Sequence, residues 1–176
     1  QRAIAAFERL TPPALLDIAD ISNNLAFIYE ADGDFDKAET FLLAATKSYH
    51  ENLGPEHERT AVLYNNVGTL YFKAGHDDRS KEMHNLALES RTGIFGEIHV
   101  ETAQSYGNLA LVLVREGDID QAKEHFENAL KGFETDLKVS RDDYEIVAAN
   151  YRDVLESLKD AKAVKVLDKR LKKHKS

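Results

Sequence analysis

Small and apolar side chains recur at helical spacing through most of this chain of 176 residues. One stretch shows the pattern clearly: Thr60, Leu63, Val67 and Leu70 are three or four positions apart, and Tyr71 lies four positions after Val67. This spacing places them on one face of an α-helix. Gly75 then predicts a left-handed C-cap, which glycine adopts without a Cβ penalty. A second helix is predicted from near Asp77 to just before Phe95.

The two-helix pattern returns every 42 residues. Three residue types keep this period: Asn24, Asn66, Asn108 and Asn150; Gly33, Gly75 and Gly117; Ala45, Ala87 and Ala129. A period of this length is typical of a solenoid, in which each unit buries its apolar face against its neighbours. The pattern predicts an all-α solenoid of antiparallel helix pairs. The long open surface of such a fold favours binding another protein over catalysis.

The period divides a single predicted domain, residues 1–176, into repeats. Repeats one to three span 14–55, 56–97 and 98–139, and a degenerate fourth repeat with a basic C-terminal cap spans 140–176. Residues 1–13 match the end of a partial upstream repeat, since Ala3 lies 42 positions before Ala45. Lys159 replaces the turn glycine in the fourth repeat, and terminal repeats are usually atypical because one face meets water.

Capping residues stand at predicted helix starts. Asp118, followed three positions later by Gln121, has the form of a capping box. Ser140 and Asp143 have the same spacing, and they predict that the first helix of the fourth repeat begins near residue 140.

Composition narrows the class of protein. Hydrophobic residues make up 43% and charged residues 31%, as in a packed soluble domain. The net charge of −8 argues against general binding of nucleic acid or of anionic membranes. No apolar stretch approaches the ~20 residues that span a bilayer. The chain has no cysteine and therefore no disulfide, which is compatible with a reducing cytosol, and we expect a cytoplasmic protein. It opens at Gln1 inside a helical pattern, which predicts a piece of a longer polypeptide and leaves a leader upstream open.

The C-terminal segment 159–176 is basic. It holds eight Lys or Arg and two Asp, a charge of +6, while the other residues carry 15 basic and 29 acidic side chains, a charge of −14. An apolar stripe is predicted at Ala161, Val164, Leu167 and Leu171, which turns Lys162, Lys165, Lys169 and Lys172 to water. The segment is interpreted as a solubilising cap. The alternative is a basic handle for an acidic partner or membrane surface.

The repeat resembles a tetratricopeptide repeat. The residues that carry the resemblance are Asn65-Asn66-Val67-Gly68-Thr69-Leu70-Tyr71, Gly75 and Ala87-Leu88. The small residue of that family's first helix matches Ala26, Gly68 and Ala110, and the small residue early in its second helix matches Ala38, Ser80 and Ala122. The resemblance implies a right-handed superhelix of helix pairs.

The 42-residue length is similar to the kinesin light chain type of this repeat. Asn23-Asn24-Leu25-Ala26 and Leu53-Gly54-Pro55-Glu56-His57 carry that likeness, over roughly residues 14 to 158. Armadillo repeats have a similar length. They use three helices per unit, whereas one glycine break here divides each unit into two helices.

In tetratricopeptide arrays the first helix of each repeat lines a concave groove, which implies a set of peptide-binding residues. These are Asp20, Asn23, Asn24, Phe27 and Glu30; Val62, Asn65, Asn66, Thr69, Phe72 and Lys73; Gln104, Asn108, Leu111, Val114 and Arg115; and Asn150 and Asp153. An asparagine amide both donates and accepts, so it can bind a peptide backbone without dictating its sequence. Phe27, Phe72 and Leu111 can supply pockets, and Lys73 and Arg115 can bind acidic residues. Alternatively, the asparagines bond neighbouring helices.

Candidate chemistry other than binding is sparse. His57 and His99 repeat with the period, but two ligands 42 residues apart are a weak metal signal, and we expect helix-start packing or capping instead. We expect no metal, no cofactor and no catalytic residues. The predicted function is a non-enzymatic scaffold or adaptor that binds a protein or extended peptide. The alternative is a self-associating module or the sensor arm of a larger signalling protein.

Overall fold

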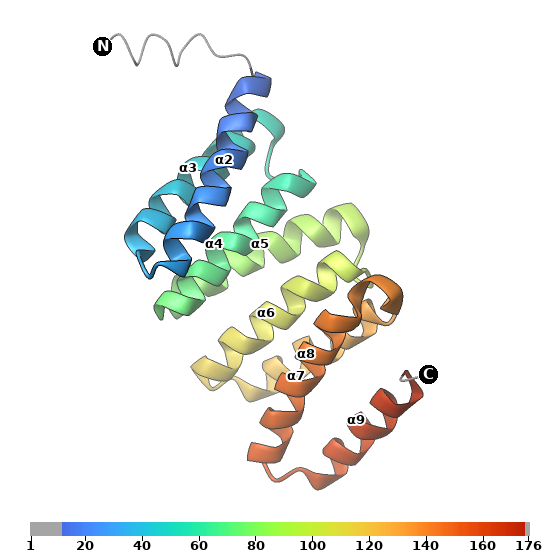
Figure 1. The fold of residues 1–176 in the computed structure, drawn as a ribbon. Helices are drawn as coiled ribbons and strands as arrows, with labels where there is room; N and C mark the ends of the chain where they lie inside the picture. The colour runs from blue at the N-terminus through green and yellow to red at the C-terminus, as the bar shows by residue number, and fades with distance from the viewer. Residues whose placement is uncertain (1–11, 175–176) are drawn as a thin grey trace, which may run out of the picture. The chain divides into compact units, whose positions relative to one another are not determined.

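The computed structural model describes residues 12–174, with side chains from Leu15 onward. This part of the chain forms helices and contains no strand (Figure 1). The helices are α2 (Pro12–Ala31), α3 (Phe35–Leu53), α4 (Glu58–Ala74), α5 (Asp77–Phe95), α6 (Val100–Glu116), α7 (Ile119–Phe133), α8 (Leu137–Ser157) and α9 (Ala161–Lys173). Two compact units divide the chain after Ile94, and each is described by itself below.

The turn between the two helices of a repeat depends on a left-handed residue. Gly33, Gly75 and Gly117 have φ angles of 80°, 79° and 84°, a conformation that glycine adopts readily. The prediction of a left-handed cap at Gly75 is therefore confirmed. Lys159 holds the equivalent turn between α8 and α9 at φ 58°, so this repeat keeps the turn without the glycine.

The helix starts predicted near Asp77 and after Asp118 are confirmed, and the start predicted in the fourth repeat is not. Asp118 accepts from the Gln121 N–H, as predicted. The predicted start near Ser140 is wrong, because α8 begins at Leu137 with Asp136 as its N-cap. The buried Ser140 hydroxyl instead donates to the carbonyl oxygens of Phe133 (2.9 Å) and Asp136 (2.7 Å), which ties the start of α8 to the end of α7.

The N-terminal unit packs α2, α3 and α4 around one cluster. Its buried members are Ala19, Ala26, Ala38, Leu42, Ala45, Tyr49, Leu63, Val67, Leu70 and Tyr71. Helix α5 joins α4 through polar contacts, since the Ser80 hydroxyl donates to the Gly68 carbonyl at 2.8 Å. The ring of His84 packs against Gly68 and is 1% exposed. The small residues predicted at helix crossings therefore allow close approach in this unit.

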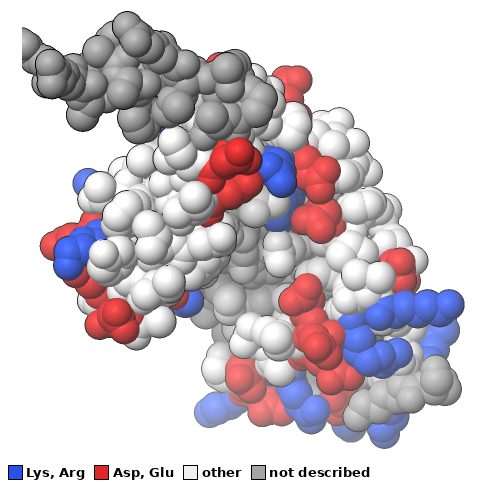
Figure 2. Space-filling view, turned by 45° about the horizontal axis from the view of Figure 1, so that its top comes forward, with Lys and Arg blue, Asp and Glu red and all other residues white. Residues whose placement is uncertain are grey.

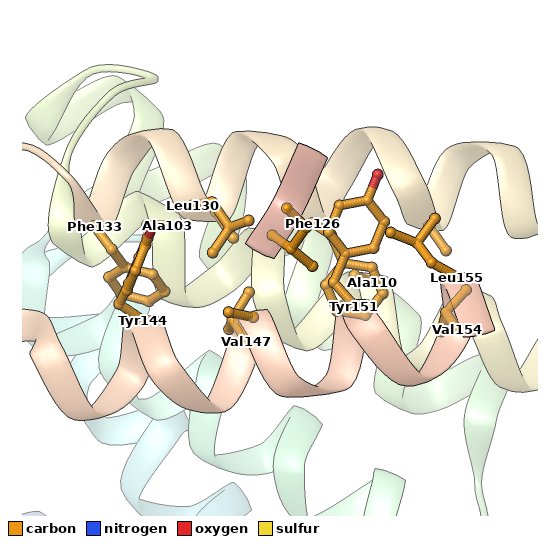
Figure 3. Close-up of a cluster of buried hydrophobic side chains, with 14 of the residues drawn as sticks. Ala103, Ala110, Phe126, Leu130, Phe133, Tyr144, Val147, Tyr151, Val154 and Leu155 are labelled. Carbon is orange, nitrogen blue, oxygen red and sulfur yellow. The ribbon is translucent and has the colours of Figure 1, made fainter. Parts of the chain in front are cut away.

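The C-terminal unit packs α6 to α9 around a second cluster (Figure 3). Phe126 of α7 stacks on Tyr151 of α8, with ring centroids 5.2 Å apart. Ala110 and Ala122 are fully buried, as expected for positions where helices cross. Leu167 of α9 is buried in the same cluster and Val164 and Leu171 pack against it, so three residues of the predicted stripe contact the core, whereas Ala161 is exposed.

The helix pairs along the chain are α2–α3, α4–α5, α6–α7 and α8–α9, and α8 begins three residues before residue 140, where the fourth repeat is predicted to begin. The partial upstream repeat predicted at residues 1–13 lies almost wholly outside the described residues.

Candidate functional site

In the N-terminal unit, α2 and α4 lie side by side and present a polar surface with one exposed aromatic ring. We call this surface the α2–α4 face, and it comprises Asn23, Asn24, Phe27, Glu30, Asn66, Thr69 and Lys73. Phe27 is 47% exposed and Asn24 is also exposed. Such a face offers a ligand amide groups and an apolar contact together.

A hydrogen bond between two of the predicted asparagines crosses this face. The Asn66 side-chain N–H donates to the Asn23 side-chain oxygen at 3.0 Å. The asparagines thus do join neighbouring helices, which was the structural alternative. An amide has two N–H donors and an oxygen with two lone pairs. This bond uses one donor of Asn66 and one lone pair of Asn23, so both amides keep capacity for a further partner.

The cation predicted to bind acidic residues already has a carboxylate beside it. Lys73 forms an ion pair with Glu30 of α2, and their side chains are 52% and 15% exposed. An acidic ligand at Lys73 must therefore share the ammonium group with Glu30 or displace that carboxylate. Surface ion pairs of this kind are weak, typically about 0–1 kcal/mol, so replacing the Glu30 carboxylate by a carboxylate of the ligand costs little free energy.

The remaining candidates on α4 point less to solvent. Asn65 is 8% exposed and has an interaction partner within the protein. Its backbone carbonyl oxygen accepts a hydrogen bond from the Thr69 hydroxyl at 3.0 Å. Phe72 is half-buried and also has a partner. The 42-residue period thus predicted one set of groove residues, but only some of them, such as Asn24 and Phe27, are exposed, whereas Asn65 is buried.

In the C-terminal unit, the candidates lie on α6 and α8. Gln104, Asn108 and Asn150 are half-buried, and Arg115 is exposed. Asn108 and Arg115 both have interaction partners within the protein. Leu111 packs against the buried cluster, which limits its role as an open pocket.

Tyrosine–carboxylate contacts were not found from the sequence. Tyr49 of α3 donates to Asp20 of α2, and Arg59 donates to the same tyrosine oxygen at 2.8 Å. Burial and the Asp20 carboxylate raise the pKa of Tyr49 to about 12, so this phenol stays a donor. Tyr71 likewise donates to Glu39 at 2.7 Å. Asp20 and Glu39 do not recur with the 42-residue period, so the period carried no signal for them.

The C-terminal unit holds a stronger network of the same kind. Arg170 of α9 donates to both carboxylate oxygens of Glu134, at 2.6 and 3.0 Å, and to Glu127 at 2.7 Å. Tyr144 donates to Glu134 at 3.0 Å. Burial opposes ionisation of Glu134, yet its bonds to Arg170 hold its pKa below the ordinary value. Bidentate pairing of this type is among the stronger side-chain contacts, and here it fastens α9 to α7.

The histidines that repeat with the period are caps. A ring nitrogen of His57 accepts from the Arg59 N–H at 3.2 Å, and one of His99 accepts from the Glu101 N–H at 3.1 Å. The prediction of helix-start capping is confirmed. Within residues 12–174, no three His, Asp or Glu side chains come together as a metal site would need. In the same part of the chain, no helix combines the length and apolar character of a membrane span.

The sequence matches the tetratricopeptide repeat family over residues 17–92 and 78–135. A search among curated proteins gives no match.

Solved structures share the fold. BtubC (BKLC) from P. vanneervenii aligns with a TM-score of 0.81 at 24% identity, covering 94% of this chain and 65% of that one. A single-residue variant of a putative kinesin light chain from Podosopora anserina, with nearly identical TPR-like repeats, aligns at 0.74 with 15% identity, covering 97% and 79%. The Sgt2 TPR domain from Aspergillus fumigatus aligns at 0.58 with 15% identity, covering 82% of each chain. The expected all-α superhelix of tetratricopeptide-like helix pairs is confirmed, and the structures that share it include kinesin light chain-like repeats.

Proposed function

This chain belongs to the tetratricopeptide repeat family, and from that premise we propose that it is a non-enzymatic protein-interaction module, a scaffold or adaptor that binds an extended peptide. The observation that carries the proposal is the α2–α4 face, where the exposed ring of Phe27 stands among amide side chains. Protein interfaces are enriched in aromatic side chains, so an exposed ring beside amides with spare hydrogen-bonding capacity is suited to contact a partner.

The amides on this face suit an extended backbone. A peptide strand presents N–H and C=O groups in alternation, and an asparagine can bind one of each. Asn24 is exposed, and Asn66 keeps one donor and its oxygen beyond the bond to Asn23. We propose that these two residues hold the peptide backbone while Phe27 covers an apolar side chain of the ligand.

We further propose that the ligand carries an acidic residue close to Lys73. Glu30, which pairs with Lys73, is 15% exposed, whereas the Lys73 side chain is 52% exposed. A ligand carboxylate can therefore approach the ammonium group of Lys73 from the solvent side. In the C-terminal unit, Asn108, Arg115 and Asn150 are proposed to make the same kinds of contact on the face of α6 and α8.

The test begins with peptides selected against the immobilised chain from a displayed library. Titration calorimetry then compares the wild type with the double variant Asn24→Ala/Asn66→Ala. Each lost hydrogen bond is worth roughly 0.5–1.5 kcal/mol, so affinity should fall about tenfold. Asn85→Ala, at an exposed position on α5, is the matched control and should bind as the wild type does. Lys73→Glu should weaken binding in a manner that added salt reduces.

Circular dichroism checks that each variant folds. If the double asparagine variant is folded and binds every selected peptide with wild-type affinity, the asparagines serve only the helix contacts and the proposal is wrong.

A second candidate function, self-association, has one observation in its favour. Ile21 and Ile28 of α2 are 59% and 57% exposed, whereas the equivalent Leu63 and Leu70 of α4 are 3% and 1% exposed. The outer side of α2 thus carries an apolar stripe at positions that α4 buries. Light scattering decides between the functions: a concentration-dependent dimer that Ile21→Asn/Ile28→Asn abolishes supports self-association, and a monomer at all concentrations excludes it.

A further inference from the structure

The exposed side of α9 carries a concentrated positive charge. Its members, which we call the lysine face, are Lys162, Lys165, Lys169, Lys172 and Lys173, and all five are exposed. At 3.6 residues per turn they fall within about a third of the helix circumference. Figure 2 shows the blue side chains gathered at this end of the chain, with acidic groups beside them.

The rest of α9 is anchored, so the lysine face stands on a fixed support. Leu167 is 3% exposed, and Val164 and Leu171 pack against the same buried cluster. Arg170, the one arginine of the helix, turns inward to Glu127 and Glu134. A ligand on the lysine face therefore meets a preformed row of charges rather than a loose tail.

The lysine face is not neutralised by the protein. Asp160 is occupied as the N-cap of α9, where it accepts from the Ala163 N–H, and Asp168 pairs with Arg152 at 2.9 Å. Among the residues that the structure describes, no ion pair involves any lysine of the face.

Helix stability accounts for Lys172 and Lys173, which lie in the last turn of α9, but not for the other lysines of the face. Cations are favourable at the C-terminal end of a helix but unfavourable in the first turn, where Lys162 lies. Neighbours three or four positions apart, such as Lys165 and Lys169, repel each other by about 0.2–0.5 kcal/mol per pair. Lys162, Lys165 and Lys169 thus oppose the helix that carries them, and a bound anion would relieve their repulsion.

We propose that the lysine face binds a short acidic segment of another protein, independently of the α2–α4 face. Charge complementarity points to an anionic partner, and the surroundings limit its size. In the same unit, residues 95–158 carry 14 acidic and six basic side chains, a charge of −8, and the exposed Glu156 stands next to α9 through its bond to Arg152. A membrane plane or a long nucleic acid would meet this surrounding negative charge, whereas a short segment would not.

The geometry fixes the length of the segment. From Lys162 to Lys172 the helix rises about 15 Å. An extended peptide rises about 3.3 Å per residue and points alternate side chains to one side. Three carboxylates at alternate positions, within about five residues, therefore match the row of lysines.

Fluorescence anisotropy with a labelled octapeptide of glutamate tests the proposal on the full chain. The variant Lys162→Gln/Lys165→Gln/Lys169→Gln should lose at least tenfold in affinity at low salt. The matched control is Lys47→Gln/Lys131→Gln/Lys138→Gln, which removes the same charge from exposed lysines elsewhere and should change affinity less than threefold. Equal losses in the two variants, or no loss in the first, would overturn the proposal.

Two further measurements keep the result decisive. Vesicles containing phosphatidylserine and a twelve-nucleotide single strand should bind more weakly than the octapeptide; tighter binding of either at these lysines overturns the choice of partner. The triple glutamine variant of the face should melt at the same temperature as the wild type or higher, because repulsion is removed. A lower melting temperature would mean that the lysines stabilise the helix, and the argument from repulsion would be wrong.

Discussion

Replacing Gly132 by alanine is expected to destabilise the C-terminal unit, although alanine is the better helix former. Gly132 lies in the last turn of α7 and is buried. A Cβ there would lie 2.7 Å from the Ala103 Cβ and 2.9 Å from the His99 carbonyl oxygen. Optimal carbon contacts are about 3.5–4.0 Å, so the shortfall is close to 1 Å.

The shortfall cannot be relieved by a side-chain rotation, since the His99 oxygen is backbone and accepts the Ala103 N–H at 2.8 Å. Helices α6 and α7 must move apart, at a cost of about 1–3 kcal/mol. Improved helix propensity offsets up to about 1 kcal/mol. A net loss near 1–2 kcal/mol corresponds to a melting temperature lower by about 2–8 °C for a chain of this size.

Gly93→Ala is the matched control for thermal unfolding followed by circular dichroism. Gly93 also lies near the end of its helix, but it is exposed and an added Cβ meets no atom within 4 Å. This variant should be unchanged or slightly more stable, by about 0.5 kcal/mol.

A second substitution at the contact tests the cause. Ala103→Gly removes one of the two close atoms, so in the Gly132→Ala background it should destabilise less than it does alone, a coupling that a double-mutant cycle measures. If Gly132→Ala melts at or above the wild-type temperature, the close approach of α6 and α7 is not a constraint and the reasoning fails.

The other predictions concern a helix crossing, a turn and a buried base. Ala122→Leu overpacks a fully buried position and should lower stability in urea titration by about 1–3 kcal/mol or more; an unchanged midpoint would place the crossing elsewhere. Lys159→Gly removes the steric strain of a lysine in the left-handed conformation. Because glycine also makes the unfolded chain more flexible, the net gain in stability should be roughly 0.5–1 kcal/mol, seen as a higher melting temperature; a lower one would refute the prediction. Burial, and secondarily the charge of Arg91, lower the pKa of His84 to about 4 from 6.5. Since the unfolded chain binds the proton more readily than the folded chain, the neutral form of His84 contributes to the free energy of unfolding. This stabilisation is fully present above pH 6.5 and is lost as the pH falls towards 4. It amounts to about 3 kcal/mol. His84→Leu, which copies Leu42 of the first repeat, should flatten the stability–pH curve in that range, and an unchanged slope would contradict the assignment.

Several features of this protein follow from the sequence because they depend on neighbours within a few positions. The glycine turns, the Asp118 cap and the histidine caps each involve a backbone group two to five residues away. The small residues at the crossings were also readable, since two helices at contact distance leave no room for larger side chains and the period marks where they meet.

Other features were decided only by the tertiary structure. Asn66 pairs with Asn23 and Lys73 with Glu30, each across 43 positions, so the contact runs between residues one step out of phase with the 42-residue period. The same limit explains Ser140, whose spacing resembled a cap but whose hydroxyl bonds back to the end of the preceding helix.

Helix α9 in the C-terminal segment combines a feature that the sequence predicts with one that only the tertiary structure decides. Its periodicity predicted which lysines face water, because an amphipathic pattern depends only on spacing along the chain. It did not reveal that Arg170 turns inward to Glu134, 36 positions away. That partner is set by how closely α9 and α7 approach, and the distance between helices depends on the packing of every side chain between them, which no local pattern encodes.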